Sequence, residues 1–142
     1  MAFNAKALKF EETTELHLKH PGTGEALYDT EGLEETDESK PVIYHLYGKA
    51  SKKYKVALDK LLAKDAKYKR LGRVPTNDEK REDSVSFLAE LSIKMDNMNH
   101  PETDEPLDNK DAFVSLLGDE HYSWIAEQAN TALGDPSNFL AK

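Results

Sequence analysis

The sequence of 142 residues contains no cysteine. Disulfide bonds, thiolate nucleophiles and cysteine-based zinc sites are therefore excluded, and the composition is compatible with a reducing compartment. No apolar run approaches the roughly 18–20 residues that a membrane-spanning helix needs. The segment MAFNAKALKFEE lacks the apolar stretch of a secretion signal, so we expect the protein to remain in the cytoplasm.

The sequence also lacks the short motifs of common enzyme and metal chemistry. It has no G-x-x-x-x-G-K-[ST] phosphate loop, no G-x-S-x-G nucleophile elbow and no H-E-x-x-H metal motif. Its five histidines are not spaced as metal ligands, and its acidic stretches do not follow the order of an EF-hand loop. We therefore expect a non-catalytic protein without a metal or other cofactor.

Positive charge is scarce, because 19 Lys and Arg residues stand against 27 Asp and Glu residues, and the net charge is -8. Residues 49–73 are the exception, with ten basic residues and two acidic ones. This segment fits either a solvated helix face beside acidic neighbours or a nucleic-acid-binding surface. The acidity of the rest of the chain disfavours contact with a phosphate backbone, so we do not expect a nucleic-acid partner.

Strand patterns occur in the first third of the chain. Residues 14–20 alternate apolar and polar side chains, PGTG at 21–24 is a turn sequence, and residues 25–29 fit a returning strand. Residues 41–48 are rich in β-branched and aromatic residues and give the strongest strand pattern. Residues 2–10 alternate less cleanly and could add a further strand.

Residues 29–40 connect these strands and are strongly acidic. They contain six acidic residues and a single apolar residue, Leu33. So little apolar surface cannot offset the conformational entropy lost on ordering. We therefore expect a mobile acidic loop.

Helical periodicity begins at residue 51. Ser51 is placed to cap a helix that Gly72 ends. The residues on one face of this helix are Tyr54, Leu58, Leu61, Leu62 and Asp65. Thr76 and Glu79 form a capping box that opens a second helix. The apolar stripe of the second helix is Val85, Leu88, Leu91 and Met95, widened by Phe87 and Met98.

Two shorter helices are predicted after a polar loop at residues 99–108. Asp108 or Asn109 caps the first, and Gly118 ends it. Its apolar residues are Phe113, Leu116 and Leu117. The last helix spans about residues 121–133, and the sequence GDPSN breaks it before an apolar tail.

Together these patterns predict an α+β fold, in which a small N-terminal antiparallel β-sheet is followed by a bundle of about four helices. We expect a single domain over residues 1–142, with the β region in 1–48 and the helical region in 49–142. We expect no internal repeat.

Three stretches carry a resemblance to a known family. IYHLYGKASKKYK at 43–55 passes from a strand through Gly-x-x-Ser-x-x-Tyr into a helix. LLGDEHYSWIAEQ at 116–128 joins a leucine pair through an acidic spacer to Trp-Ile-x-x-Gln, and DPSNFLAK at 135–142 contains Asn-Phe-Leu. In this order they resemble the tail assembly chaperones of long-tailed bacteriophages.

The resemblance implies a non-catalytic protein that binds the phage tape measure protein, the tail tube protein or both, and keeps its client soluble until the tube polymerises. It also implies a location in the host bacterial cytoplasm and absence from the mature virion. A chaperone of helical chains with exposed apolar stripes needs complementary apolar grooves and strong surface charge. The same surfaces would allow the chain to associate with itself.

The resemblance and the residue types together give a candidate partner-binding set: Tyr122, Trp124, Gln128, Phe139, Leu140, Met95 and Met98. Trp124 with Tyr122 is the best anchor, since Trp and Tyr dominate binding hot spots. The methionines offer adaptable apolar contacts. The spacing of Ile125 and Leu133 predicts that both face the core. Trp124 lies about one position off that stripe, so the core and the interface both stay open for it.

Two other functions use the same features. A structural virion component, such as a head–tail connector or a tail completion protein, would make permanent contacts through the same apolar surfaces. A nucleic-acid-binding accessory protein would instead use the basic helix at residues 49–73.

Overall fold

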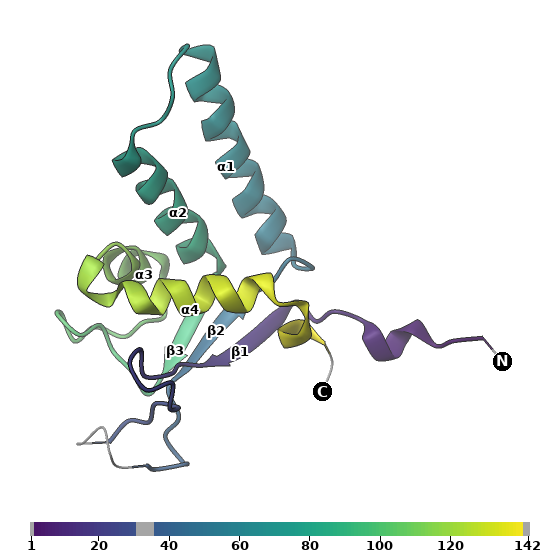
Figure 1. The fold of residues 1–142 in the computed structure, drawn as a ribbon, viewed down its shortest axis with the longest axis vertical. Helices are drawn as coiled ribbons and strands as arrows, with labels where there is room; N and C mark the ends of the chain where they lie inside the picture. Colours follow the sequence, from purple (N-terminus) through teal and green to yellow (C-terminus); the bar gives the residue numbers. More distant parts are fainter. Residues whose placement is uncertain (1, 31–35, 141–142) are drawn as a thin grey trace.

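The computed structural model describes residues 2–30 and 36–140. As the sequence predicts, they form an α+β fold with a three-stranded antiparallel sheet and four α-helices (Figure 1). The strands are β1 (Thr13–His17), β2 (Ile43–Tyr47) and β3 (Ser92–Asp96). The helices are α1 (Lys52–Arg70), α2 (Asn77–Leu91), α3 (Lys110–Leu117) and α4 (Ser123–Gly134). Short 3-10 helices are η1 (Ala5–Leu8), η2 (Glu120–Tyr122) and η3 (Pro136–Phe139).

The central strand of the sheet is β2, which pairs antiparallel with both neighbours. Tyr44 lies opposite Leu16 of β1 and Met95 of β3. A register shift between His45 and Leu46 marks a β-bulge in the pairing with β3. Because β1 and β3 are both antiparallel to β2, they run parallel to each other and finish at the same end of the sheet.

The third strand corrects the sequence prediction of a purely helical region after residue 49. The spacing of Leu91, Met95 and Met98 predicted one continuous helix, but α2 ends at Leu91 and β3 begins at Ser92. The segment SIKMD also alternates apolar and polar residues, so it fits a strand as well as a helix. Backbone pairing with β2, which is distant in sequence, makes this segment a strand instead of a continuation of the helix.

The core lies against one face of the sheet. Tyr44 and Leu46 of β2 are fully buried, and the Tyr44 ring stacks on Phe113 of α3 with ring centroids 5.4 Å apart. Ile125 and Leu133 of α4 are buried in the same cluster. Their predicted place in the core is therefore confirmed.

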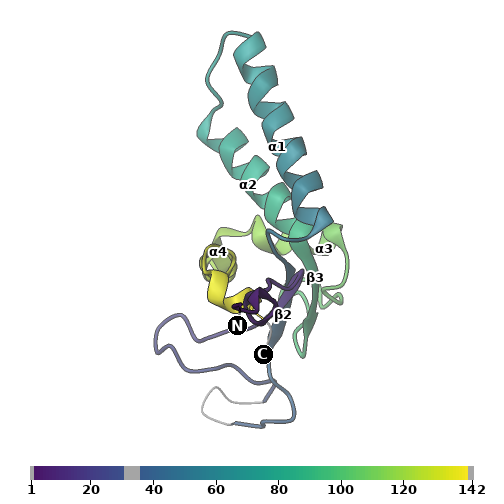
Figure 2. The same cartoon turned by 90° about the vertical axis from the view of Figure 1, so that its right-hand side faces the viewer.

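A helical hairpin of α1 and α2 projects away from the sheet (Figures 1 and 2). The Ser51 hydroxyl caps α1 by accepting the Tyr54 N–H at 3.1 Å. Gly72 takes φ +66° just after the last turn, a conformation that glycine adopts without strain. Thr76 and Glu79 form the capping box at the start of α2. These helix-end predictions are confirmed.

The packed face of α1 is narrower than the sequence predicts. Ala57 is buried and Leu58 is partly buried, whereas Leu62 is 54% exposed. The prediction for Leu62 is wrong because α1 packs chiefly on α2. A single neighbouring helix covers a narrower strip than the expected bundle would.

The two shorter helices match their predictions closely. Asn109, not Asp108, caps α3, and its side-chain oxygen accepts the Ala112 N–H at 2.9 Å. The last helix, α4, begins at Ser123 after the 3-10 turn η2 and ends at Gly134. No helix in the described part of the chain has both the length and the apolar character to cross a bilayer.

The weaker strand predictions are wrong. Residues 2–10 form an arm that contains η1, and Phe10 makes an isolated antiparallel bridge with Leu140 (Figure 1). Residues 25–29 make isolated bridges to their neighbours instead of a continuous strand. Both segments lack a long partner strand, and without one a short alternating segment does not become part of a sheet.

The acidic loop at residues 29–40 falls partly outside the described residues, because 31–35 are not among them. At its base, the Asp29 N–H donates to the Lys40 carbonyl at 2.9 Å. The predicted mobility of this loop stays a prediction.

Two turns that share a sequence pattern follow the outer strands, and they correct our expectation that the chain has no internal repeat. His-Pro-x-Thr-x-Glu-x-Leu occurs at residues 20–27 after β1 and again at 100–107 after β3. In each turn the histidine Nδ1 accepts two backbone N–H groups, and the threonine hydroxyl accepts the glutamate N–H. In both turns the backbone N–H of the histidine also donates to the backbone carbonyl of the glutamate. The chain therefore builds one turn twice, at the same end of the sheet.

The two turns differ in how the protein surrounds them. Gly24 and Asp104 occupy the same position with φ +77° and +60°, and aspartate is one of the few residues besides glycine that tolerates this region. His100 is buried and lies 3.0 Å from the Ser115 hydroxyl of α3. His20 lies nearer the surface, in a groove beside α4.

The role of the histidine can be tested by exchanging its acceptor atom. His20→Leu removes the Nδ1 that accepts the Gly22 and Thr23 N–H groups, and we expect it to lower the free energy of unfolding by about 1 kcal/mol. His20→Asn should stay close to the unsubstituted protein, because an asparagine oxygen accepts the same type of bond in turns. Urea unfolding measures both changes. Equal losses in the two variants would show that ring packing holds the turn.

Candidate partner-binding surface

The aromatic candidates lie at the start of α4. The Tyr122 hydroxyl donates to the Glu102 carboxylate of the second turn at 2.7 Å, and this bond raises the pKa of the hydroxyl. Trp124 is partly buried and packs against the core cluster while part of its surface stays accessible. Part of the Trp124 indole therefore belongs to the core, and its accessible part stays a candidate for the interface.

Trp124 lies in an open groove of about 570 Å³ between α4 and the first turn, which we call the α4 groove. One wall comes from the chain around the first turn: Leu16, Lys19, His20, Pro21 and Gly24. The other wall comes from α4 and the residues after it: Trp124, Glu127, Gln128, Thr131, Ala132, Asp135 and Asn138. The groove thus combines an indole and a proline ring with charged and polar groups, a lining that suits an amphipathic partner.

Gln128 has a structural task in this groove. Its Oε1 accepts the Lys19 N–H at 2.9 Å, and its Nε2 donates to the Lys19 carbonyl at 2.7 Å. The side-chain amide thus pairs with the backbone as a neighbouring strand would and ties the first turn to α4. Gln128 therefore positions the groove wall, and its predicted contact with a partner stays a prediction.

Met95 and Phe139 are buried, with 8% and 6% of their surface exposed. Met95 lies in β3 and its predicted availability to a partner is wrong, whereas Phe139 packs its ring on Gly48 and leaves only a small part of it to line a neighbouring cavity. Met98 and Leu140 are partly buried, Met98 against the core and Leu140 in its bridge with Phe10. Tyr122 and Trp124 are partly exposed, so they stay the strongest anchor candidates.

Phe139 packs on the backbone of Gly48 at very close range. A Cβ atom at position 48 would lie 2.2 Å from the phenyl ring, so only glycine leaves room for it. Asn138 strengthens this junction, because its carbonyl accepts the Thr14 hydroxyl at 2.6 Å and its amide donates to Ala132 at 3.1 Å. The chain after α4 is therefore fastened to β1, to α4 and to the turn that follows β2.

A smaller cavity of about 260 Å³ lies beside Phe139, and we call it the apolar pocket. Most of its lining is apolar, and the lining residues are Phe10, Glu11, Lys49, Ala50, Leu133, Gly134, Pro136 and Phe139. It opens where the N-terminal arm joins the rest of the chain.

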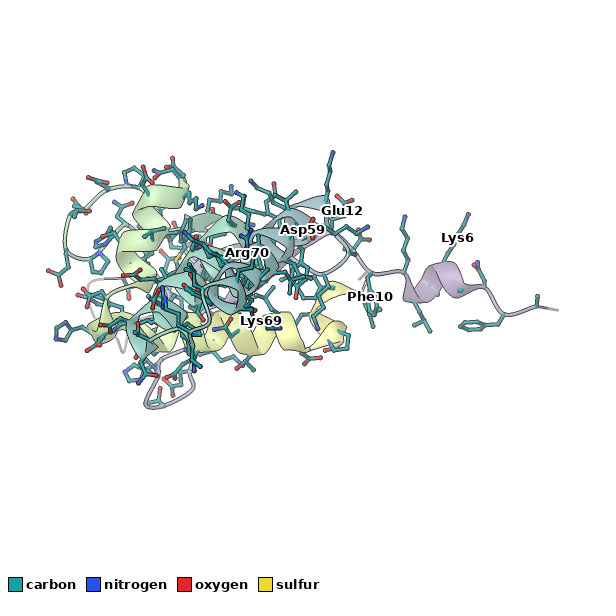
Figure 3. All side chains as sticks on the ribbon, turned by 90° about the horizontal axis from the view of Figure 1, so that it is seen from above. Lys6, Phe10, Glu12, Asp59, Lys69 and Arg70 are labelled. Atoms are coloured by element: carbon teal, nitrogen blue, oxygen red, sulfur yellow. The ribbon has the colours of Figure 1, made fainter. Side chains whose placement is uncertain are left out.

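The basic residues of α1 divide into two sets. Lysines that face α2 pair with its carboxylates: Lys53 and Lys60 with Glu90, and Lys64 with Asp83. The remaining basic residues make no ion pair with the described residues, and they are Lys52, Lys55, Lys67, Lys69 and Arg70. Lys69 and Arg70 lie at the tip of the hairpin (Figure 3). Packing thus neutralises part of the basic segment within the protein.

Glu90 is the buried carboxylate of this network. Lys60 and Lys110 each lie 2.7 Å from its Oε1, and their hydrogen bonds lower the pKa of Glu90 to about 2. Because Lys110 begins α3, this carboxylate joins three helices.

The histidines serve hydrogen bonds within the fold. His45 lies 2.7 Å from Asp96 on the neighbouring strand, and this bond lowers the pKa of Asp96. His17 Nε2 lies 2.7 Å from the Leu27 carbonyl. Among the described residues, no three His, Asp or Glu side chains are grouped to hold a metal ion.

Comparison of the chain with protein families, with curated proteins and with solved structures found no match. The function is therefore argued from the residues and their arrangement.

Sequence reasoning missed two features of this surface. The first is the exposed apolar side chains of the N-terminal arm, which were interpreted as half of a strand pattern. The second is the repeated turn, whose signal is five identical positions in eight, at residues 20–27 and 100–107. A search of the whole sequence for short repeats would have found it.

The contact of Gly48 with Phe139 predicts a sharp difference between two glycines. Gly48→Ala forces the ring to move and should lower the free energy of unfolding by about 1–3 kcal/mol. Gly134→Ala is the matched control, because no atom lies within 4 Å of a Cβ there, and it should be neutral or slightly stabilising. Urea unfolding compares them. Equal stability of the two variants would show that the Phe139 ring moves aside without lowering the free energy of unfolding.

Removal of the Glu90 charge should destabilise the helices in a pH-dependent way. Glu90→Gln is expected to lower the free energy of unfolding by about 1–3 kcal/mol at pH 7. The pKa falls from 4.5 in the unfolded chain to about 2, so this contribution is complete above about pH 4.5 and is lost as pH falls through 2.

Thermal unfolding between pH 7 and pH 2 measures how the stability difference between Glu90→Gln and the unsubstituted protein changes with pH. Glu82→Gln, on the exposed side of α2, is the control and should change stability little at any pH. A Glu90→Gln loss that stays constant down to pH 2 would contradict the role of the charge.

Proposed function

We propose that this protein is a tail assembly chaperone of a long-tailed bacteriophage, which binds the tape measure protein, the tail tube protein or both before the tube polymerises. The observation that best supports the proposal is the convergence of the three stretches that resemble this family. Gly48 of the first stretch contacts Phe139 of the third, and Trp124 and Gln128 of the second line the groove that Asn138 borders. Residues that are scattered in the sequence thus lie next to one another, in a buried contact for the first and third stretches and along the α4 groove for the second and third.

The α4 groove suits a reversible interaction with a helical client. Trp124 offers part of an indole at the surface, and such a residue can anchor a partner when it becomes fully buried. Charged and polar side chains line much of the groove around it, so the groove itself is not a large apolar patch. A groove of moderate size also allows release, which a chaperone of the host bacterial cytoplasm needs if it is absent from the mature virion.

Co-expression with the tape measure protein of the same phage tests the proposal. We expect the tape measure protein to become soluble and to be recovered in a complex with this chain. If it stays insoluble and no complex forms with it or with the tube protein, the chaperone proposal fails. Recovery of this chain from purified, mature particles would instead favour a structural virion component.

Trp124→Ala tests whether the α4 groove is the client site. We expect client binding to weaken by about 10-fold or more, the usual effect of removing a hot-spot tryptophan. Leu62→Ala is the control, because Leu62 is an exposed apolar residue of α1 far from the groove, and it should bind the client normally.

Thermal unfolding of the same variants separates the two roles of Trp124. A moderate loss of stability, of at most about 2 kcal/mol, is expected because only part of the indole packs on the core. Normal client binding by Trp124→Ala would place the client elsewhere on the surface.

A further inference from the structure

The N-terminal arm, residues 2–10, leaves large apolar side chains exposed. Every residue of the arm is exposed, and η1 has no buried residue. Its large apolar side chains include Phe3, which is 76% exposed, and also Leu8 and Phe10. Apolar side chains that are exposed together on one short segment, unlike single exposed ones, are a feature of interaction surfaces.

The arm leaves the rest of the chain and points away from it (Figures 1 and 3). It is anchored at its base, where the Glu11 N–H donates to the Phe139 carbonyl at 2.6 Å and the Glu12 carbonyl accepts the Gly48 N–H at 2.8 Å. The sequence from 2 to 12 contains no glycine or proline, the residues that most readily reverse a chain. The arm is therefore poorly suited to fold back on its own base.

The apolar pocket lies directly at that base, and Phe10 forms part of its wall. Its volume of about 260 Å³ is sufficient for one phenyl ring, since a cavity of about 150 Å³ can hold benzene. Ala50, Leu133 and Pro136 would surround such a ring. The protein thus presents an unfilled apolar pocket and an unburied phenylalanine on adjoining parts of one chain.

The charges around the arm are self-complementary. Lys6 and Lys9 are its only charged side chains, and the three acidic residues Glu11, Glu12 and Glu15 follow directly. When two copies approach with their arms antiparallel, the basic block of one comes to the acidic block of the other. This arrangement favours a second copy of the same chain over an unrelated partner.

We propose that two copies of this protein exchange their N-terminal arms, so that Phe3 of each copy fills the apolar pocket of the other. The ring packs against Ala50, Leu133 and Pro136, and Lys6, three residues further along the arm, lies on the side of the acidic residues at the base of the other arm. The contact is isologous, because each copy supplies one arm and one pocket. It requires no client, so its success or failure is independent of the chaperone proposal.

Analytical ultracentrifugation over a range of protein concentrations tests the exchange. The unsubstituted chain should form a dimer, and Phe3→Ser should raise the dimer dissociation constant by roughly 10- to 100-fold, as expected for the loss of one buried aromatic side chain. Val74→Ser is the matched control, because Val74 is 78% exposed on the hairpin, and it should leave the constant unchanged. A chain that stays monomeric at every concentration, or a Phe3→Ser dimer of unchanged strength, overturns the proposal.

Disulfide trapping distinguishes arm exchange between two copies from an arm that folds back on its own copy. The chain has no native cysteine, so only the introduced cysteines can form a disulfide. Phe3→Cys protein mixed with Ala50→Cys protein should form a disulfide-linked heterodimer, whereas Phe3→Cys mixed with Val74→Cys should not. The double variant carrying both Phe3→Cys and Ala50→Cys should link between chains. A disulfide that forms only within one chain shows that the arm covers its own pocket and overturns the proposal.

Discussion

The hydroxyl of Tyr44 joins the sheet to the point where α2 becomes β3. The ring is fully buried in the central strand and stacks on Phe113, and the hydroxyl bonds to Ser92. Ser92 in turn donates to the Leu88 carbonyl in the last turn of α2, so its oxygen receives the proton of Tyr44. Burial raises the pKa of Tyr44, and the hydroxyl therefore keeps this proton. The third strand, the turn after it and the position of α3 all depend on this junction.

The two His-Pro-x-Thr-x-Glu turns show how one local structure can serve two purposes. Each turn satisfies its own backbone groups through histidine and threonine side chains, so its shape does not depend on what surrounds it. Ser115 of α3 lies against the buried His100, while Gln128 of α4 holds Lys19 at the surface. The α4 groove exists on the side where the turn stays exposed.

The segments outside the core carry most of the exposed apolar surface. Phe3, Leu8 and Phe10 lie on the arm, and Leu62 and Val74 lie on the hairpin of α1 and α2. The hairpin is held by a narrow apolar strip, in which Tyr54 packs on Phe87, and by the ion pairs of Glu90 and Asp83 with lysines of α1. A small core with two apolar extensions fits a protein that acts through contacts with other chains, whether a client or a second copy.

The sequence by itself determined most helix ends and the strongest strand, because caps, glycines and short-range periodicity act within a few residues. Ser51, Thr76 and Gly72 are examples, and each performs its predicted role. Only the tertiary structure decided that residues 92–96 form a strand and that Phe139 is buried. Both outcomes depend on partners distant in the chain, β2 for the first and Gly48 for the second, and local patterns do not contain that information.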